Sequence, residues 1–522
     1  MNPAVPITMA MGLLLQSASF AATDGRPSSV SVSVDTGTVV NTMRGGIGAS
    51  WHALEEPILY SDSPHPVFGN KSHGGSGWGA YPPAEDAAAW QQIDRHARWL
   101  GLDWNRVELE QRIYEPQRGQ FTWDNREMRI LYRILDWCET NKADVFLQQM
   151  WGNVAWNAFP EWRDDPAGRV HSGPASMDDF AEGLARLVEH LVRTKGYTCI
   201  RWLSINNEPN GAWSWWLRPP NRLMPLRPGL AAVRKALDAR GLHTPLSGPD
   251  MTGGVPPLEP QRFDFLDLLG AYDFHTYDEN FDWLSNGQMQ RFDRTTADWA
   301  SWAHRSRKPL FVSEFGTMAN GWGSDHPGPS CYESVLKDAE LVVRRISAGV
   351  DGFNRWSFIN RGDLDGQWQF IETWDRNEKK LLRQFTPHAN TYFLLGLLSR
   401  FTTKGSDVLR CQVDGGHDGA WQRVFATALR GRKGNITLAV VNDAKTGLDV
   451  SWELRGIDRE VVLHRYAVNE TQRDRVDLTI EPLAQYRLSR GAASFKDRLA
   501  PMSLTIYSMY RLSRSDDGAT AE

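Results

Sequence analysis

The sequence is poor in cysteine, with four among 522 residues: Cys138, Cys199, Cys331 and Cys411. They occur singly, without the paired spacing typical of zinc sites, so no structural metal is predicted. A chain of this length can bury a sizeable core without a disulfide scaffold. Isolated buried thiols are therefore the preferred interpretation. If the protein is exported, one disulfide stays an open alternative that the sequence cannot pair.

The chain also lacks an excess of positive charge and long apolar runs. Its net charge is −5, which gives no support for a nucleic-acid partner or an anionic membrane surface. Beyond the N-terminal segment, no run is long and apolar enough to span a bilayer, and no repeat of solenoid period occurs. These observations favour a globular protein whose substrate is not selected by charge, and no cofactor is predicted.

Both ends of the chain differ from the rest. Residues 1–22 have an apolar centre from Met9 to Leu15 and small residues at Ser19, Ala21 and Ala22, which suit cleavage of a signal peptide. No Lys or Arg precedes the apolar run, so a buried or disordered N-terminus is the alternative. We expect a secreted or periplasmic protein. Residues 514–522 have the composition of a disordered tail.

Short apolar runs alternate with helical patterns between residues 43 and 400, which is typical of repeated βα units around a parallel sheet. The predicted strands number eight and point to a (β/α)8 TIM barrel. They are 44–50, 103–109, 144–150, 200–206, 244–250, 272–277, 309–315 and 352–358. Helices are predicted at 84–101, 177–197, 329–349 and 379–401, where apolar residues recur at helical spacing.

The pattern changes after about residue 400. Segments from 401 to 513 are short, alternating and bounded by Gly, Asn or Asp, which predicts an antiparallel β-sandwich as a second domain. An N-terminal segment, residues 23–42, contains the alternating run 28–36 and precedes the first barrel strand. We expect it to pair with the C-terminal sheet.

Two glutamates mark the predicted site. In a TIM barrel, catalytic residues lie at the C-terminal ends of the strands and in the loops that follow. Glu208 follows the fourth strand and Glu314 ends the seventh, and each would be costly to bury without a partner. Cleavage of a glycosidic bond needs two such carboxyl groups, one as acid and one as nucleophile or base. The pair therefore predicts a glycosidase.

The two motifs, "NEP" at residues 207–209 and "SEFG" at 313–316, resemble those of clan A of the retaining glycoside hydrolases. The added β-domain is similar in layout to those of families 30 and 39. This resemblance implies that Glu208 is the general acid/base and Glu314 the nucleophile. The enzyme would be an O-glycosyl hydrolase that acts by double displacement, with retention at the anomeric carbon.

The resemblance extends to five supporting residues. It implies that Arg106 hydrogen-bonds the nucleophile, and a guanidinium there would lower the pKa of the carboxyl group. It places Asn207 on the sugar 2-hydroxyl, His275 near the acid/base and Tyr277 near the nucleophile. Trp356 would form the aromatic platform under the sugar. An ordinary core ion pair or packing is the alternative for Arg106 and Tyr277.

Tryptophan is abundant, with 23 residues, and its flat apolar face suits a sugar ring as well as a core. Five further substrate-binding candidates lie just past strand ends. They are Trp51 and His52 after the first strand, Gln149 and Trp151 at the third, and Trp213 after the fourth. Core packing is the alternative for the tryptophans, and a structural role for His52.

The predicted partner is a glycoside, an oligosaccharide or a polysaccharide. A noncatalytic carbohydrate-binding barrel protein is the alternative, and it would be favoured if one glutamate were missing. A metal-dependent hydrolase would need clustered histidines and carboxylates, and the strands carry only His52 and His275 at their ends. The sequence specifies neither the sugar and linkage, nor exo against endo action, nor the oligomeric state.

Overall fold

A computed structural model describes residues 29–52, 81–211, 214–277, 286–317, 331–360, 368–375, 377–378, 380–419, 421–470, 478 and 480–512. The predicted signal peptide, the tail and Trp213 lie outside these residues. Within them, no helix is long and apolar enough to cross a membrane.

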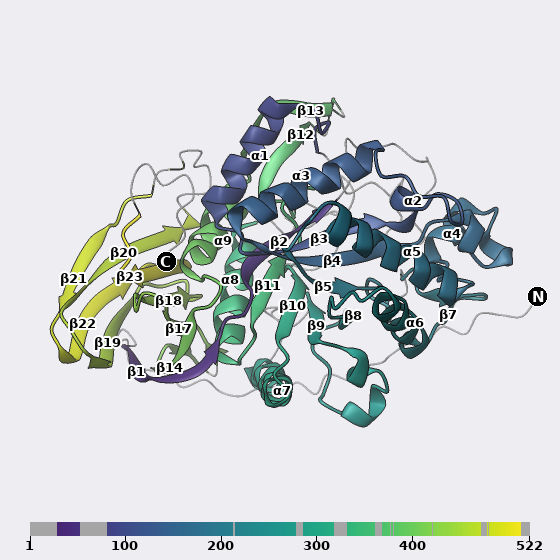
Figure 1. Ribbon diagram of the computed structural model, residues 1–522. Helices are drawn as coiled ribbons and strands as arrows, with labels where there is room; N and C mark the ends of the chain where they lie inside the picture. Colours follow the sequence, from purple (N-terminus) through teal and green to yellow (C-terminus); the bar gives the residue numbers. More distant parts are fainter. Residues whose placement is uncertain are drawn as a thin grey trace, which may run out of the picture.

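The centre of the molecule is an eight-stranded parallel barrel, which confirms the predicted fold class (Figure 1). Its neighbours follow the order β5-β4-β3-β2-β11-β10-β9-β8, and Leu203 pairs with Leu246 to close the ring. The strands are β2 (Gly46–His52), β3 (Trp104–Glu110), β4 (Asp144–Trp151), β5 (Ile200–Ser204), β8 (Ser247–Met251), β9 (Ala271–Thr276), β10 (Leu310–Phe315) and β11 (Gly352–Arg355).

Side-chain alternation divides the barrel interior into an apolar floor and a polar mouth. Near the start of the strands, Trp104, Phe146, Ala271 and Phe311 pack together, with Trp104 and Phe311 stacked at 4.3 Å between ring centroids. Two residues further along β3 the inward position is Arg106. Since successive side chains of a strand point to opposite faces, the polar residues of the site stand directly above this floor.

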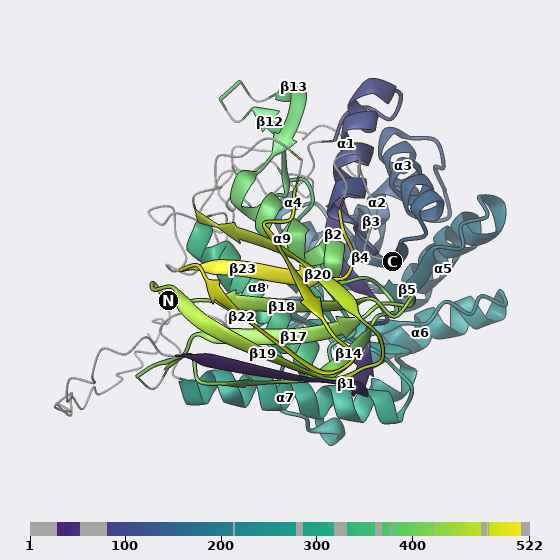
Figure 2. The ribbon, with the colours of Figure 1, turned by 90° about the vertical axis from the view of Figure 1, so that its left-hand side faces the viewer.

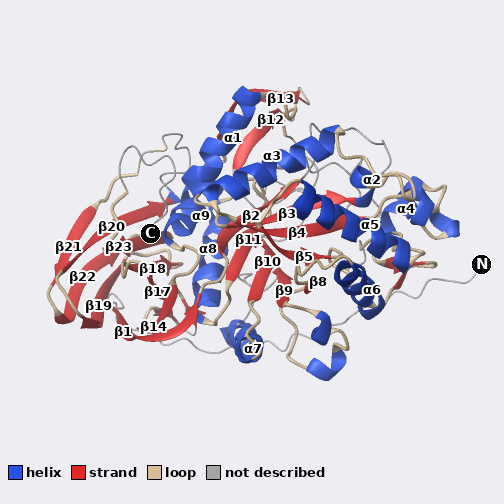
Figure 3. Cartoon of the chain, viewed as in Figure 1, coloured by secondary structure: helices blue, strands red, loops and turns tan. Residues whose placement is uncertain are grey.

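Helices surround the barrel, as Figure 3 shows by colour. They are α1 (Ala87–Leu100), α2 (Gln111–Tyr114), α3 (Arg126–Asn141), α4 (Pro166–His171), α5 (Met177–Glu189), α6 (Leu226–Ala239), α7 (Asn286–Arg305), α8 (Tyr332–Ser347) and α9 (Ala389–Phe401). A π-turn, η3 (His190–Thr194), extends α5, and short 3-10 turns occur at η1 (Ala155–Asn157), η2 (Pro160–Trp162), η4 (Pro260–Arg262) and η5 (Leu266–Leu268). Between β8 and β9 only the turns η4 and η5 replace the expected helix in the described chain.

The predicted helix 379–401 is wrong in its first half. Lys380–Pro387 forms strand β13, which pairs antiparallel with β12 (Ile371–Asp375), and α9 begins only at Ala389. Proline disfavours the α conformation in the residue before it and has no N–H to donate, so Pro387 separates the two elements. The second half, Ala389–Phe401, is helical as predicted.

The C-terminal part forms a mostly antiparallel β-domain, as predicted. Its strands make one continuous sheet in the order β21-β20-β23-β18-β17-β14-β1-β19-β22. They are β1 (Val30–Thr42), β14 (Asp407–Asp414), β17 (Val424–Arg430), β18 (Ile436–Asn442), β19 (Leu448–Ile457), β20 (Val461–Asn469), β21 (Ala484–Leu488), β22 (Gly491–Leu499) and β23 (Ser503–Ser508). Two further hairpins join β6 (Leu217–Arg218) to β7 (Arg222–Leu223) and β15 (His417–Asp418) to β16 (Trp421–Gln422).

The sheet curls so that two distant parts of it face each other. Trp452 of β19 and Tyr507 of β23 are far apart in the strand order, yet their ring centroids are 5.5 Å apart. The N-terminal strand β1 lies between β14, to which it is antiparallel, and β19, to which it is parallel (Figure 2). The opposite face of the central strands packs on α8 and α9, so these two helices join the barrel to the β-domain.

Candidate active site

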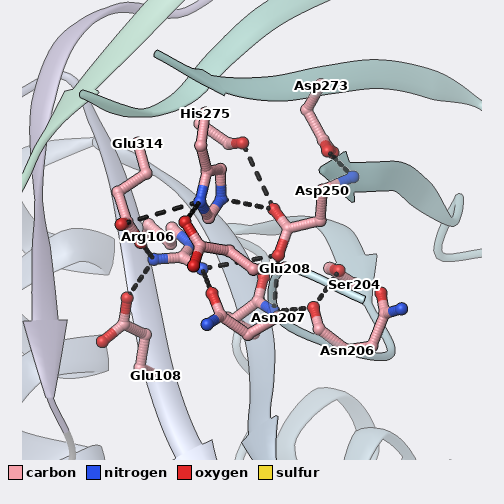
Figure 4. A network of polar contacts seen from close by, with 12 residues as sticks. Arg106, Glu108, Ser204, Asn206, Asn207, Glu208, Asp250, Asp273, His275 and Glu314 are labelled. Atoms are coloured by element: carbon pink, nitrogen blue, oxygen red, sulfur yellow. Dashed lines mark hydrogen bonds and ion pairs between the residues drawn. The ribbon is translucent and has the colours of Figure 1, made fainter. Parts of the chain in front are cut away.

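Glu208 and Glu314 lie close together at the mouth of the barrel (Figure 4). Glu208 follows β5 and Glu314 lies near the end of β10, and they are 7% and 5% exposed. One carboxylate oxygen of each lies within 4.8 Å of the other and of a ring nitrogen of His275. The structure therefore brings together two carboxyl groups that are 106 positions apart in the sequence.

Arg106 of β3 lies beneath this pair and is fully buried. Its guanidinium group contacts the carboxylates of Glu314 and Glu108, and it donates a 2.6 Å hydrogen bond to Asn207 Oδ1. Burial lowers the pKa of Arg106, but the charges of Glu108 and Glu314 outweigh burial and raise it. Arg106 therefore supplies a fixed positive charge that also orients Asn207.

Both oxygens of Glu314 have partners. Tyr277 donates a 2.6 Å hydrogen bond to Oε1, and Arg106 contacts Oε2. Burial raises the pKa of Glu314 above its ordinary value, while the charges of His275 and Arg106 act in the opposite direction. The guanidinium thus lowers the pKa of the carboxyl group as expected, but in this closely packed site burial has the larger effect.

His275 of β9 lies between the two glutamates. Its Nδ1 is 2.8 Å from Glu208 Oε1 and 3.6 Å from Glu314 Oε1, and its Nε2 is 3.0 Å from Asp250 Oδ1. Burial lowers the pKa of His275, but Glu314 and Asp250 raise it well above the ordinary value. The protonated ring can donate from both nitrogens, which fits the carboxylate oxygens that face them.

Asp250, at the end of β8, is a central residue that the sequence analysis missed. It contacts His275 and Arg106, and its backbone oxygen accepts a 3.0 Å hydrogen bond from the Glu208 N–H. The φ angles of Glu208 and Asp250 are 42° and 57°, in the left-handed region. Asp250 ends its strand as the two glutamates end theirs, and this signal could have identified it.

His52, Glu108 and Trp356 form one wall of the site. His52 Nδ1 contacts the Glu108 carboxylate, and the rings of His52 and Trp356 meet edge to face at 4.9 Å between centroids. Among the described residues, His52 Nε2 has no hydrogen-bond partner. Trp356 is buried and follows β11, and its ring adds an aromatic surface beside His52.

Three predicted site residues do not lie in this network. Trp51 is fully buried on the outer side of the barrel, where it packs against Trp137 of α3 and Phe358. Gln149 has the same outward phase on β4: its amide oxygen accepts from Tyr114 of α2, and its amide nitrogen donates to the Trp151 backbone oxygen. Because side chains alternate along a strand, Trp51 and Gln149 point to the helix layer. Trp151 follows a register shift of β4, where it pairs with Glu110, so alternation from Gln149 does not set its direction.

The inward residue of β4 is Gln148 rather than Gln149. Its amide nitrogen donates a 3.1 Å hydrogen bond to Asp250 Oδ2 and another to the backbone oxygen of Asn206. The glutamine that contacts the site is therefore the neighbour of the predicted one. A two-residue period counted from Phe146, on the barrel floor, identifies it.

Glu208, His275 and Glu314 are the one group of described residues with donor atoms close enough to hold a metal ion. Two observations favour a carboxylate pair instead. His275 Nδ1 already lies at hydrogen-bonding distance from Glu208, and the Arg106 guanidinium is in contact with Glu314. A fixed cation at this position opposes the binding of a second one.

No protein-family model and no curated protein sequence matches the chain. Solved structures do share its fold, and they include clan A glycoside hydrolases of families 30 and 51. Each similarity covers the barrel together with the β-domain. The common class is therefore the (β/α)8 barrel fold of these glycoside hydrolases with an added β-domain.

Three of these structures can be named. The family 30 subfamily 8 xylanase from Clostridium acetobutylicum has a TM-score of 0.57 at 14% identity, over 92% of this chain and 99% of that one. The family 30 xylanase C catalytic domain from Talaromyces cellulolyticus has 0.59 at 14%, with coverages of 92% and 99%. The family 51 arabinofuranosidase from Xanthomonas axonopodis pv. citri has 0.55 at 11%, with 92% and 99%.

Proposed function

We propose that the protein is a retaining glycoside hydrolase in which Glu314 is the nucleophile and Glu208 the general acid/base. The observation that carries this proposal is the spacing of the two carboxyl groups. Their nearest oxygens lie within 4.8 Å, compared with about 5 to 5.5 Å for retaining pairs and about 6.5 to 9.5 Å for inverting pairs. The spacing leaves no room for the water that an inverting enzyme places between its carboxylates.

The reaction follows from the contacts of each carboxyl group. A Glu314 oxygen attacks the anomeric carbon while Glu208 gives its proton to the departing glycosidic oxygen, whose bond to that carbon breaks. Glu208, now a carboxylate, takes a proton from water, and the water oxygen displaces Glu314 from the sugar. Arg106 and Tyr277 hold the two oxygens of Glu314 in place for both steps.

Other residues of the site suit a sugar substrate. Asn207 is oriented by Arg106 beside the acid/base, where its amide nitrogen can donate to a hydroxyl group. His52, whose Nδ1 contacts Glu108, offers Nε2 as a second polar group, and Trp356 offers an apolar ring for a sugar face. The similar structures are named as xylanases and an arabinofuranosidase, which supports a glycoside or polysaccharide substrate.

Hydrolysis of a panel of aryl glycosides and polysaccharides tests the proposal, with proton NMR of the first product anomer. We expect retention of configuration. The variant Glu314→Gln should lose nearly all activity, whereas Glu208→Gln should retain activity on aryl glycosides with good leaving groups, which need no proton. Glu340→Gln, a buried glutamate of α8 outside the site, is the matched control and should behave as the wild type.

Azide separates the two roles. With Glu208→Ala, azide should attack the glycosyl-enzyme and give a glycosyl azide of retained configuration. With Glu314→Ala, azide should replace the nucleophile and give the inverted product. A first product of inverted configuration from the wild type would contradict the mechanism. Sugar binding without hydrolysis of any panel member would instead favour the noncatalytic carbohydrate-binding alternative.

Export is part of the same proposal and rests on residues 1–22. Their apolar centre and the small residues at Ser19, Ala21 and Ala22 fit a signal peptide. Expression of the full chain in a bacterial host, followed by N-terminal sequencing of the periplasmic fraction, tests it. We expect cleavage close to residue 22. A full-length protein retained in the cytoplasm would contradict it.

A further inference from the structure

Asp250 contacts residues from most of the strands that form the site. Its Oδ1 faces His275 Nε2 at 3.0 Å and Ser313 Oγ at 3.3 Å. Its Oδ2 faces Gln148 Nε2 at 3.1 Å and Arg106 Nη2 at 3.5 Å. The side chain is completely buried, so both oxygens depend on these contacts rather than on water.

The backbone of Asp250 is fixed on both sides. Its oxygen accepts the hydrogen bond from the Glu208 N–H, and its own N–H donates 2.8 Å to Asp273 Oδ1. Burial and the negative charge of Asp250 raise the pKa of Asp273 to about 8, which favours its neutral form. Asp250 therefore acts on Glu208 in two ways: directly through the backbone and indirectly through His275.

We infer that Asp250 is a positioning residue for the double displacement, which holds the His275 ring between Glu208 and Glu314 and fixes the backbone of Glu208. This inference rests on the proposed function. Asp250 does not touch the reacting atoms. It keeps His275 Nδ1 directed at the acid/base. It also stabilises the protonated form of the His275 ring, and the positive charge of that ring offsets the negative charge of both glutamates.

The variant Asp250→Asn isolates this role because it keeps the shape of the side chain and removes its charge. An amide has one acceptor atom, so it cannot accept from both Gln148 and His275. If its oxygen keeps Gln148, its amide nitrogen must donate to His275 Nε2. The imidazole then stays neutral, and the carboxylates of Glu208 and Glu314 face a weaker donor.

Kinetics of the full-length Asp250→Asn protein should show a split between the two constants. We expect kcat to fall on the order of 10²-fold because the reacting groups are misplaced. KM should change less than about threefold, since the residue makes no substrate contact. Asp351→Asn is the matched control: Asp351 is an equally buried aspartate that lies 2.7 Å from His304 Nε2, at the N-terminal end of the barrel. Its kinetic constants should equal those of the wild type.

Ring ¹⁵N NMR of histidine-labelled protein gives a readout that a purely structural role would not move. The groups that face His275 are Glu208 and Glu314 at Nδ1 and Asp250 at Nε2, with Asp273 nearby on β9. The wild-type ring should carry two protons at pH 7. In Asp250→Asn the titration midpoint of His275 should move to lower pH, because the ring loses its charged partner.

The outcomes separate the two proposals. A wild type that hydrolyses no panel member refutes the proposed function. An active wild type with unchanged kcat and an unchanged His275 titration in Asp250→Asn refutes this inference alone. If Asp250→Asn gives too little folded protein, Gln148→Leu removes one anchor of Asp250 without a change of charge. This variant should lower kcat about tenfold, because the loss of one hydrogen bond corresponds to about a tenfold change in rate. An unchanged kcat in Gln148→Leu would overturn the inference.

Discussion

Substitution of Arg106 by lysine or by methionine separates the geometry of its guanidinium group from its charge. The guanidinium contacts Glu314 and Glu108 through one nitrogen and donates 2.6 Å to Asn207 Oδ1 through another. Lysine keeps the positive charge, but all its N–H donors are on one nitrogen at the end of a flexible chain. It can stay against the two glutamates only if it gives up Asn207. Methionine removes every one of these contacts.

The contacts set the size of the two effects. Arg106→Lys loses one charge-assisted hydrogen bond, worth about 2 kcal/mol, and so should lower kcat/KM by about 30-fold. Arg106→Met leaves the buried Glu108 and Glu314 without the guanidinium group. Breaking a buried ion pair on one side costs about 3 to 5 kcal/mol of unfolding free energy. The lysine variant should therefore fold normally and react slowly, whereas the methionine variant should be less stable.

The assays are kcat/KM on an aryl glycoside and urea unfolding followed by tryptophan fluorescence. Arg118→Lys is a matched control because Arg118 forms an exposed ion pair with Asp179, and such pairs contribute little. It should leave both quantities unchanged. A lysine variant as active as the wild type would show that the fork geometry of Arg106 has no role. A methionine variant of wild-type stability would refute the charge argument.

Three further changes have defined outcomes. Tyr277→Phe removes the 2.6 Å hydrogen bond to Glu314, so kcat/KM should fall about 10- to 150-fold while the protein stays folded. A variant with the kcat/KM of the wild type would show that Tyr277 does not orient Glu314. Burial raises the pKa of Asp273 from 3.8 to about 8, so the stability that depends on its proton is fully present below about pH 4 and is lost as the pH rises through 8. Asp273→Asn has no such proton to lose. In urea titrations its free energy of unfolding should therefore rise relative to that of the wild type over this pH range. Lys337→Met removes the ammonium group 2.6 Å from Asp443 of the β-domain, while Arg423 Nη1 stays 3.1 Å from the same oxygen. Unfolding free energy should therefore fall by about 1.5 to 3 kcal/mol, as for one hydrogen bond to a charged group, whereas an unchanged urea midpoint would show that this contact between α8 and the β-domain is not needed.

The sequence predicts the barrel well because its strands are short, apolar and separated by helical patterns. All eight predicted strands overlap the observed ones, and helix α1 ends at Gly101, whose φ of 63° suits a glycine cap. The pattern fails at Lys380–Pro387, where Leu381, Leu382 and Phe385 have the spacing of a helix face. This segment is a strand because it forms a hairpin with β12, the strand just before it in the chain, and a count of helical spacing takes no account of such pairing.

The sequence predicts the site in part, and the residues that it misplaces have physical explanations. The rule that functional residues end the strands identified Glu208 and Glu314, and it should also have identified Asp250. It does not say which of two neighbouring residues points inward. Trp51 and Gln149 were chosen at strand ends, but alternation sends their side chains to the helix layer, while His52 and Gln148 face the site. Register, rather than position along the chain, decides between such neighbours.

Alternation alone also fails at the two residues of the site where the strands bulge. On β10, Val312 pairs with Phe274 of β9 and Glu314 pairs with the next residue, His275. Ser313 is therefore the extra residue of a bulge. Ser313 and Glu314 consequently both contact inward groups, which an ideal strand forbids.

On β8 the same step from Pro249 to Met251 leaves Asp250 as the extra residue, with its φ of 57°. A positive φ outside glycine costs about 1 to 3 kcal/mol and persists only where the surrounding structure enforces it. At Asp250 that structure is the contact set with His275 and the Glu208 N–H. The bulges therefore let Asp250 reach His275 and Ser313 and let Glu314 reach Tyr277, and this geometry depends on the pairing with neighbouring strands rather than on alternation within one strand.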